Sequence, residues 1–206
     1  MAIPEKLASV IAAWEGLISQ DGELPAVERK KILLLVGDLS ASEQADAAYL
    51  RRARLALICA IEVLDRTELY PDLQSSARAM LQSGIAALSG ELDLKLLERE
   101  NGAFHTKVID LFEHGESAFS SVYAGMACFA AINTVLYDTN FDLTGRSEKT
   151  VSPDDWDASF YASLAVSGSA IWEKKGGVEE RRAYWRWYLQ TAIPYAWNVV
   201  AVLQLS

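Results

Sequence analysis

Residues 181–197, RRAYWRWYLQTAIPYAW, combine three arginines with six aromatic side chains. Such a mixture could stack on nucleobases, clamp an anion or pack into a core. On a helical wheel, a single line of positions continues into the apolar end of the chain: Trp185, Tyr188, Leu189, Ala192, Ala196, Val199 and Leu203. We predict that this line is buried, and that Arg182 and Arg186 lay their aliphatic stems over ring faces.

A ligand-binding interpretation of the same region stays open. Trp172, Arg182 and Trp185 could surround an internal pocket, as in a helical small-molecule-binding regulator or enzyme. Pro194 predicts a bend in this helix, because it removes the hydrogen bond to the carbonyl of Gln190.

A second candidate site is acidic and lies along the polar connector 138–155 and its exit. It consists of Asp138, Asp142, Asp154, Asp155, Trp156 and Asp157. Aspartates around one large aromatic side chain are typical of a surface that binds a basic protein. The alternative is structural: Asp154 and Asp155 would start a helix after Pro153, with Trp156 turned into the core.

Groups that could carry out catalysis are sparse. His105 and His114 fall on different faces of a helix and are poor co-ligands for a metal, and Glu113, His114 and Glu116 are typical of a solvated helix end. The sequence has no Cys-x-x-Cys pair, no glycine-rich phosphate loop and no nucleophile elbow. We therefore predict no catalytic residue, no cofactor and no metal site, and hence a protein that is not an enzyme.

Composition limits the partners and the compartment. With 206 residues and a formal net charge of −9, the chain is a poor general binder of nucleic acid and suits a basic partner. Cys59 and Cys128 each lie in an apolar, alanine-rich segment, where buried free thiols are expected. No basic region precedes a long apolar run at the N-terminus, so no signal peptide is expected. These features indicate a reducing, cytoplasmic location.

One uncharged stretch, residues 118–137, is long enough to span a bilayer. Acidic residues flank it without a nearby lysine or arginine to set a topology, and Ser120, Ser121, Asn133 and Thr134 dilute its hydrophobicity. We predict a buried central helix and no membrane partner.

The elements that position these groups are helical, because apolar residues recur at helical spacing and strand-like alternation is absent. We predict an all-α fold: a single globular bundle of eight or nine helices over residues 1–206, with a near-uncharged central helix. Two fused helical halves meeting near 114–117 are the alternative. The expected helices cover about 4–20, 25–39, 40–66, 70–88, 91–100, 103–113, 117–137, 154–172 and 178–204. Ser40 and Glu43 have the spacing of a capping box that opens the third helix.

The tryptophan-rich end resembles an all-α family of bacterial immunity proteins of polymorphic toxin systems, immunity protein family five. The matching residues there are Arg182, Trp185, Trp187, Leu189, Ile193, Pro194 and Trp197. RLALICAIEVLDRTELYPDLQSSARAML and DDWDASFYASLAVSGSAIWE are also similar, so the likeness extends over about 50–197. The chain departs from the family where Arg78 stands alone in SSAR, and where SVYAGMACFAAI replaces a histidine-bearing central helix.

The resemblance implies that the chain inhibits a cognate toxin by stoichiometric binding. An acidic surface would suit a basic toxin domain, such as a nuclease with a phosphate-attracting cleft. A helical adaptor or structural interaction protein shares the acidity and the lack of catalytic groups, and it remains an alternative.

Overall fold

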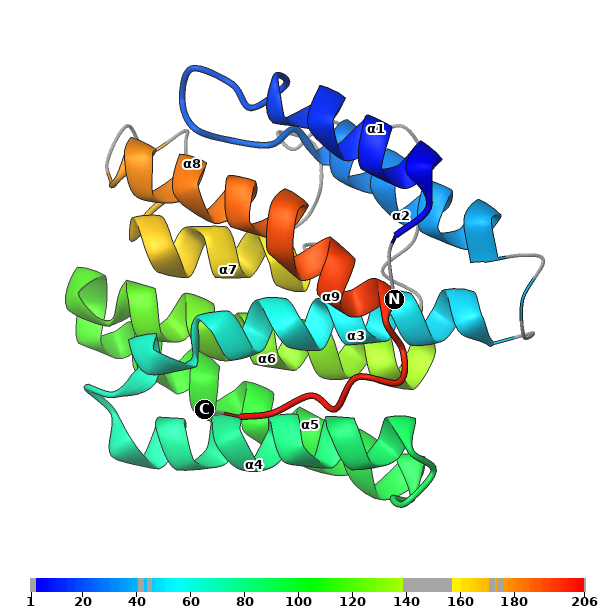
Figure 1. The fold of residues 1–206 in the computed structure, drawn as a ribbon. Helices are drawn as coiled ribbons and strands as arrows, with labels where there is room; N and C mark the ends of the chain where they lie inside the picture. The colour runs from blue at the N-terminus through cyan, green and yellow to red at the C-terminus, as the bar shows by residue number, and fades with distance from the viewer. Residues whose placement is uncertain are drawn as a thin grey trace.

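The computed structural model describes residues 3–40, 43, 46–138, 157–170, 173 and 176–205 (Figure 1). Within these ranges the chain forms helices and no strand, so the all-α prediction is confirmed. The helices are α1 (Glu5–Glu15), α2 (Ala26–Ser40), α3 (Ala47–Glu62), η1 (Leu64–Thr67), α4 (Pro71–Leu88), α5 (Leu94–Asp110), η2 (Leu111–Ala118), α6 (Phe119–Tyr137), α7 (Ala158–Ser167), α8 (Val178–Trp187), η6 (Tyr188–Ala192) and α9 (Ile193–Trp197).

The helices stack in successive pairs: α1 with α2, α8 with α7, α3 with α6, and α4 with α5 (Figure 1). Leaving aside the short η1, they make seven helical runs in the described part of the chain, slightly fewer than the expected eight or nine. The difference arises because the three helices expected at 91–100, 103–113 and 117–137 form one run, in which η2 joins α5 to α6.

The central helix is α6, packed by α3, α4, α5 and α7. Small residues let its neighbours approach: a Cβ atom on Gly125 would lie 2.8 Å from Val108, and one on Gly84 of α4 would lie 2.6 Å from Ile132. By length and mean hydropathy the run Leu94–Tyr137 could cross a membrane, and 67% of its most apolar window is buried inside the molecule. That burial is typical of the core helix of a globular protein.

The possible boundary between two halves falls in η2, where Gly115 adopts a left-handed φ of 70°. The hydrophobic core is nevertheless one cluster that contains residues from both sides of this point, including Leu57 of α3 and Trp185 of α8. The number of domains stays a prediction.

The expected capping box at Ser40 is wrong. Ser40 is the last residue of α2, and its hydroxyl donates to the carbonyl of Val36 at 2.5 Å. The buried side chain of Arg51 explains the difference, because it donates to the Ser40 hydroxyl and pairs with the Glu43 carboxylate, each at 2.7 Å. Both residues of the expected box therefore bind one arginine, and α3 begins only at Ala47.

The predicted helix break at residues 101–102 is also wrong, and α5 continues through it. The amide of the buried Asn101 donates to the Asn133 side chain at 2.8 Å and to the carbonyl of Phe129 at 3.3 Å. Asparagine otherwise favours turns, and these two bonds stabilise it within the helix.

The last helix ends at Trp197 and not near 204. Residues 198–205 then run across α3 towards α4 as a non-helical C-terminal segment, drawn in red in Figure 1. The Tyr195 hydroxyl holds this segment by donating to the carbonyl of Val202 at 2.7 Å. The bend expected at Pro194 takes the form of η6, a π-helical turn directly before it.

Candidate functional site

Two of the acidic candidates, Asp138 and Asp157, lie at the two ends of the connector and line the same small cavity. The cavity has a volume of about 30 Å³, and Leu33, Cys59 and Tyr188 form part of its wall. This space suits about one or two water molecules. The structure thus brings the two ends of the connector together, whereas Asp142, Asp154, Asp155 and Trp156 lie outside the described residues.

Asp138 ends α6 in a left-handed conformation with φ of 46°. Its carboxylate accepts two hydrogen bonds from Arg52 of α3, one from Nε at 2.8 Å and one from Nη2. Such a two-pronged pair fixes the position of both groups. The connector therefore leaves α6 from a defined point.

Asp157 begins α7 as its N-cap, where one carboxylate oxygen accepts from the backbone N–H of Phe160 at 2.8 Å and from the Ser159 hydroxyl. The other oxygen accepts from Arg29 of α2 at 2.6 Å. The Arg29 guanidinium also lies over the rings of Phe160 and Trp185, 4.9 Å and 5.3 Å from their centroids. Both described aspartates are thus paired with arginines of the helical body, which weakens their role as an open acidic surface.

Replacing Asp157 with asparagine tests this structural role. Asparagine can still cap α7, but the buried Arg29 loses its charged partner, so we expect the free energy of unfolding to fall by about 1–3 kcal/mol. Chemical denaturation measures the change. Asp110→Asn, at an exposed aspartate, is the control and should stay within about 0.5 kcal/mol. An Asp157→Asn variant as stable as the control would assign the carboxylate to a surface role.

The aromatic run 181–197 is mainly core. Of the predicted buried line, all members are buried except Val199, which is partly exposed. Trp185 is fully buried, and the rings of Tyr184 and Tyr188 meet it edge-on with centroids 5.1 Å and 5.4 Å away. Burial raises the pKa of both tyrosines well above the ordinary value, so their hydroxyls stay protonated.

The three residues of the possible pocket are not seen around one described cavity. Arg182 donates to the carbonyls of Ser19 and Gln20 at 3.0 Å and 2.9 Å, whereas Trp185 packs against Arg29 and the two tyrosines. Trp172 lies outside the described residues. The arginine over the Trp185 ring is Arg29 from α2, not the expected Arg182.

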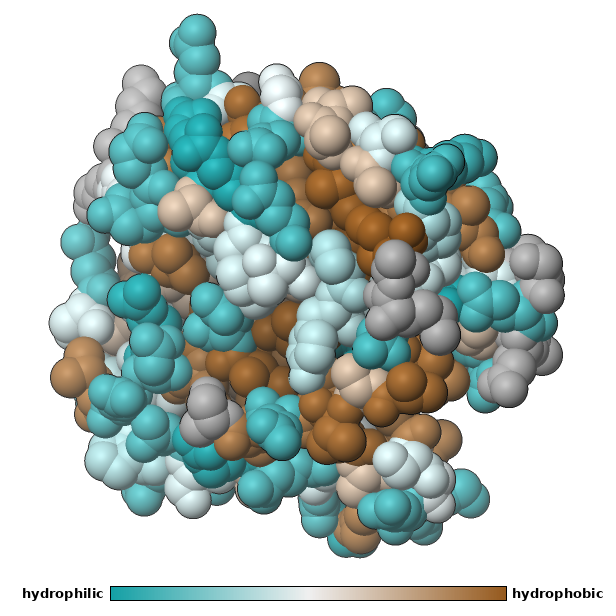
Figure 2. Space-filling model, in the orientation of Figure 1, coloured by the Kyte–Doolittle hydropathy of each residue, from teal (hydrophilic) through white to brown (hydrophobic). Residues whose placement is uncertain are grey.

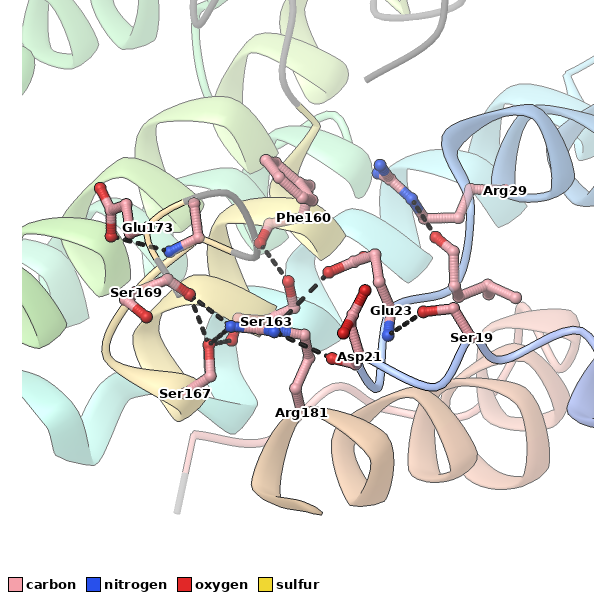
Figure 3. Close-up of polar contacts among 12 residues, drawn as sticks. Ser19, Asp21, Glu23, Arg29, Phe160, Ser163, Ser167, Ser169, Glu173 and Arg181 are labelled. Carbon is pink, nitrogen blue, oxygen red and sulfur yellow. Dashed lines mark hydrogen bonds and ion pairs between the residues drawn. The ribbon is translucent and has the colours of Figure 1, made fainter. Parts of the chain in front are cut away.

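A buried polar network around Arg181 is absent from the sequence prediction (Figure 3). Its guanidinium donates to the carbonyls of Asp21 and Ser169 at 3.0 Å and 2.6 Å, and to the Ser167 hydroxyl at 3.1 Å. Its Nε atom lies 3.7 Å from the carboxylate of Glu23, and both side chains are 2% exposed. The network ties the α1–α2 loop to α7 and α8. Arg181 stands four residues before Trp185, so the helical wheel did contain its signal.

The two cysteines lie in the core, and the two histidines make ring contacts. Cys59 and Cys128 are free and buried, as predicted, and burial raises the pKa of Cys128 to about 12 and that of Cys59 further. A thiol that stays protonated at neutral pH is a poor nucleophile. The ring of His105 stacks on that of Phe129 with the centroids 4.1 Å apart, and the ring of His114 packs against that of Tyr70 with the centroids 5.5 Å apart. In the ranges that the structure describes, no three His, Cys, Asp or Glu side chains form a metal-binding group.

The sequence model of a protein family described as immunity protein Imm5 matches residues 12–195. This range contains both connector ends and the arginines that hold them, together with Arg181 and Trp185. No curated protein matches the chain.

Proposed function

Since the chain belongs to the Imm5 family of immunity proteins, we propose that it neutralises a cognate bacterial toxin by stoichiometric binding. The match over residues 12–195 is the observation that carries this proposal. We further propose that the toxin is part of a polymorphic toxin system, that the two proteins meet in the cytoplasm, and that inhibition involves no enzymatic step. Inhibition by binding needs a complementary surface and no reactive group.

The interior supports binding rather than catalysis. The two thiols are buried and protonated, and the polar groups of the Arg181 network are largely occupied with one another. These side chains thus hold the α1–α2 loop, α7 and α8 together. Helices held together in this way suit an inhibitor, because little conformational freedom is then lost on association.

The net charge of −9 supports a basic toxin. An acidic surface steers a cationic partner and raises the association rate by about 10–10³-fold. We propose that the connector contributes Asp142, Asp154, Asp155 and Trp156 to this surface. The ion pairs of Asp138 with Arg52 and of Asp157 with Arg29 support a fixed position for both of its ends.

Reversing two connector charges tests the acidic surface. Asp154→Lys combined with Asp155→Lys should slow association with the toxin about tenfold and reduce its dependence on salt, with thermal stability nearly unchanged. Stopped-flow mixing over a series of salt concentrations measures both effects. The control is Glu91→Lys with Glu100→Lys, which makes the same change in net charge at two exposed residues of the described surface. Equal slowing in both variants would show that total charge acts and that the connector is no contact site.

Co-expression tests the proposed function itself. A toxin encoded beside the gene for this chain should arrest growth when expressed alone, and this chain should restore growth and co-purify with the toxin at equal stoichiometry. Restored growth without a complex would point to an enzyme or regulator. A complex without restored growth would point to an adaptor.

A further inference from the structure

Arg54 is a buried cation on α3. Arg54 is only 7% exposed, and its Nε and Nη2 atoms are buried without a hydrogen-bond partner. Within the described residues no carboxylate pairs with it, and the nearest charge-stabilising contact is the Tyr195 ring, whose centroid lies 6.0 Å from the guanidinium carbon. The other three buried arginines of the described chain, Arg29, Arg51 and Arg181, each have a carboxylate partner.

An arginine in this state is costly. Desolvation lowers the pKa of Arg54, with Tyr195 opposing the shift only in part. Buried donors without partners each lose the energy of the bonds that they made with water. A structure that keeps such a group on a cavity wall suits an anion that arrives from outside.

Arg54 lines a cavity of about 260 Å³ between α3, α4 and the C-terminal segment. Most of the other side chains of the wall are aliphatic, including Leu50, Ile85, Leu88, Val199 and Leu203, and Ser89 adds a hydroxyl group. Val200 and Val202 also line the cavity, and they are 79% and 72% exposed. In Figure 2 apolar residues, coloured brown, gather over the lower middle of this face, where Figure 1 shows the C-terminal segment running between α3 and α4.

These observations define the chemistry of a ligand. A single guanidinium neutralises one negative charge, which is the charge of a carboxylate, whereas a phosphate dianion would need a second cation, and Arg54 is the one charged side chain among the described residues of the wall. The aliphatic wall calls for an apolar group beside the charge. Pockets of about 300–1,000 Å³ hold drug-sized ligands, so the present volume suits a smaller molecule.

We propose that this cavity binds a small aliphatic carboxylate, with its charged end on Arg54 and its chain along α4 and the C-terminal segment. A flexible acyl chain can carry a carboxylate down to a nearly buried arginine. An aspartate on a folded partner would have to bring its backbone into the cavity to reach the same point. The proposal does not depend on toxin neutralisation.

Isothermal titration calorimetry with octanoate tests the site in the full-length protein. Octanoate should bind with 1:1 stoichiometry and raise the melting temperature, whereas acetate, which lacks the chain, and octylamine, which lacks the negative charge, should bind at least tenfold more weakly. Arg54→Met should weaken octanoate binding at least tenfold. The unliganded variant should melt no earlier than the parent protein, because methionine removes an uncompensated charge and keeps the volume.

Arg66→Met is the matched control, because Arg66 is about half exposed and lies outside the cavity wall. It should bind octanoate like the parent protein. Absence of octanoate binding, or equal binding by Arg54→Met and the parent, would overturn the proposal. Weaker association of Arg54→Met with the toxin, together with no octanoate binding, would likewise overturn it and assign Arg54 to a protein contact.

Discussion

Replacing Trp185 with alanine is expected to lower the free energy of unfolding by about 3–5 kcal/mol. The indole is fully buried between Arg29, Tyr184 and Tyr188. Its removal leaves a cavity that fixed helices on several sides cannot close. A loss of this size is a large part of the total stability of an ordinary domain, so the variant should melt early or aggregate.

Differential scanning calorimetry beside a toxin-binding titration measures this change. The control is Trp187→Ala on the same helix, where the indole is only partly buried and the expected loss is about half as large. If Trp185→Ala folded normally and lost only affinity, the aromatic run would be a contact surface and its assignment to the core would be wrong.

Replacing Arg181 with methionine is expected to lower the free energy of unfolding by about 3–5 kcal/mol, because it breaks a buried ion pair from one side. The carboxylate of Glu23 would stay almost fully buried and lose the guanidinium 3.7 Å away. The carbonyls of Asp21 and Ser169 would lose their arginine donors as well.

Two further variants sharpen the measurement by chemical denaturation. Arg186→Met removes an arginine from the same helix that pairs with Glu15 at the surface, and it should cost no more than about 1 kcal/mol. Arg181→Met with Glu23→Met should be more stable than Arg181→Met alone, because both charges are gone. If Arg181→Met cost no more than Arg186→Met, the network would be dispensable.

The sequence predicted most of the architecture because helical periodicity is a local signal. The uncharged stretch at 118–137 became the buried helix α6, and the line through Trp185 became core. The errors are at boundaries, where distant side chains decide. The Arg51 guanidinium donates to the Ser40 hydroxyl and pairs with the Glu43 carboxylate. The Asn133 side chain accepts a hydrogen bond from Asn101 in the middle of α5.

The pairings of the acidic residues could not be predicted from the sequence. Asp138 and Asp157 line one small cavity, but their arginine partners lie 86 and 128 residues away in the sequence. The burial of Arg181 and Arg54 was not predicted, because arginine side chains are usually exposed. Only the packing of the helices shows that both guanidinium groups are buried.

The arginine bonds between the first and last helices bear on how the chain folds in the cell. The loop before α2 is tied to α8 by bonds from Arg181 to Asp21 and from Arg182 to Ser19, which join residues 160 and 163 positions apart. At a synthesis rate of about 5–20 residues per second, the ribosome makes the intervening chain in roughly 8–30 seconds. During that time α2 can already pack against α3, whereas α1, which carries the buried Trp14, lacks its contact with η6. The apolar face of α1 therefore stays uncovered on the nascent chain until residues 188–192 have been made, and we expect it to be a face that a chaperone protects.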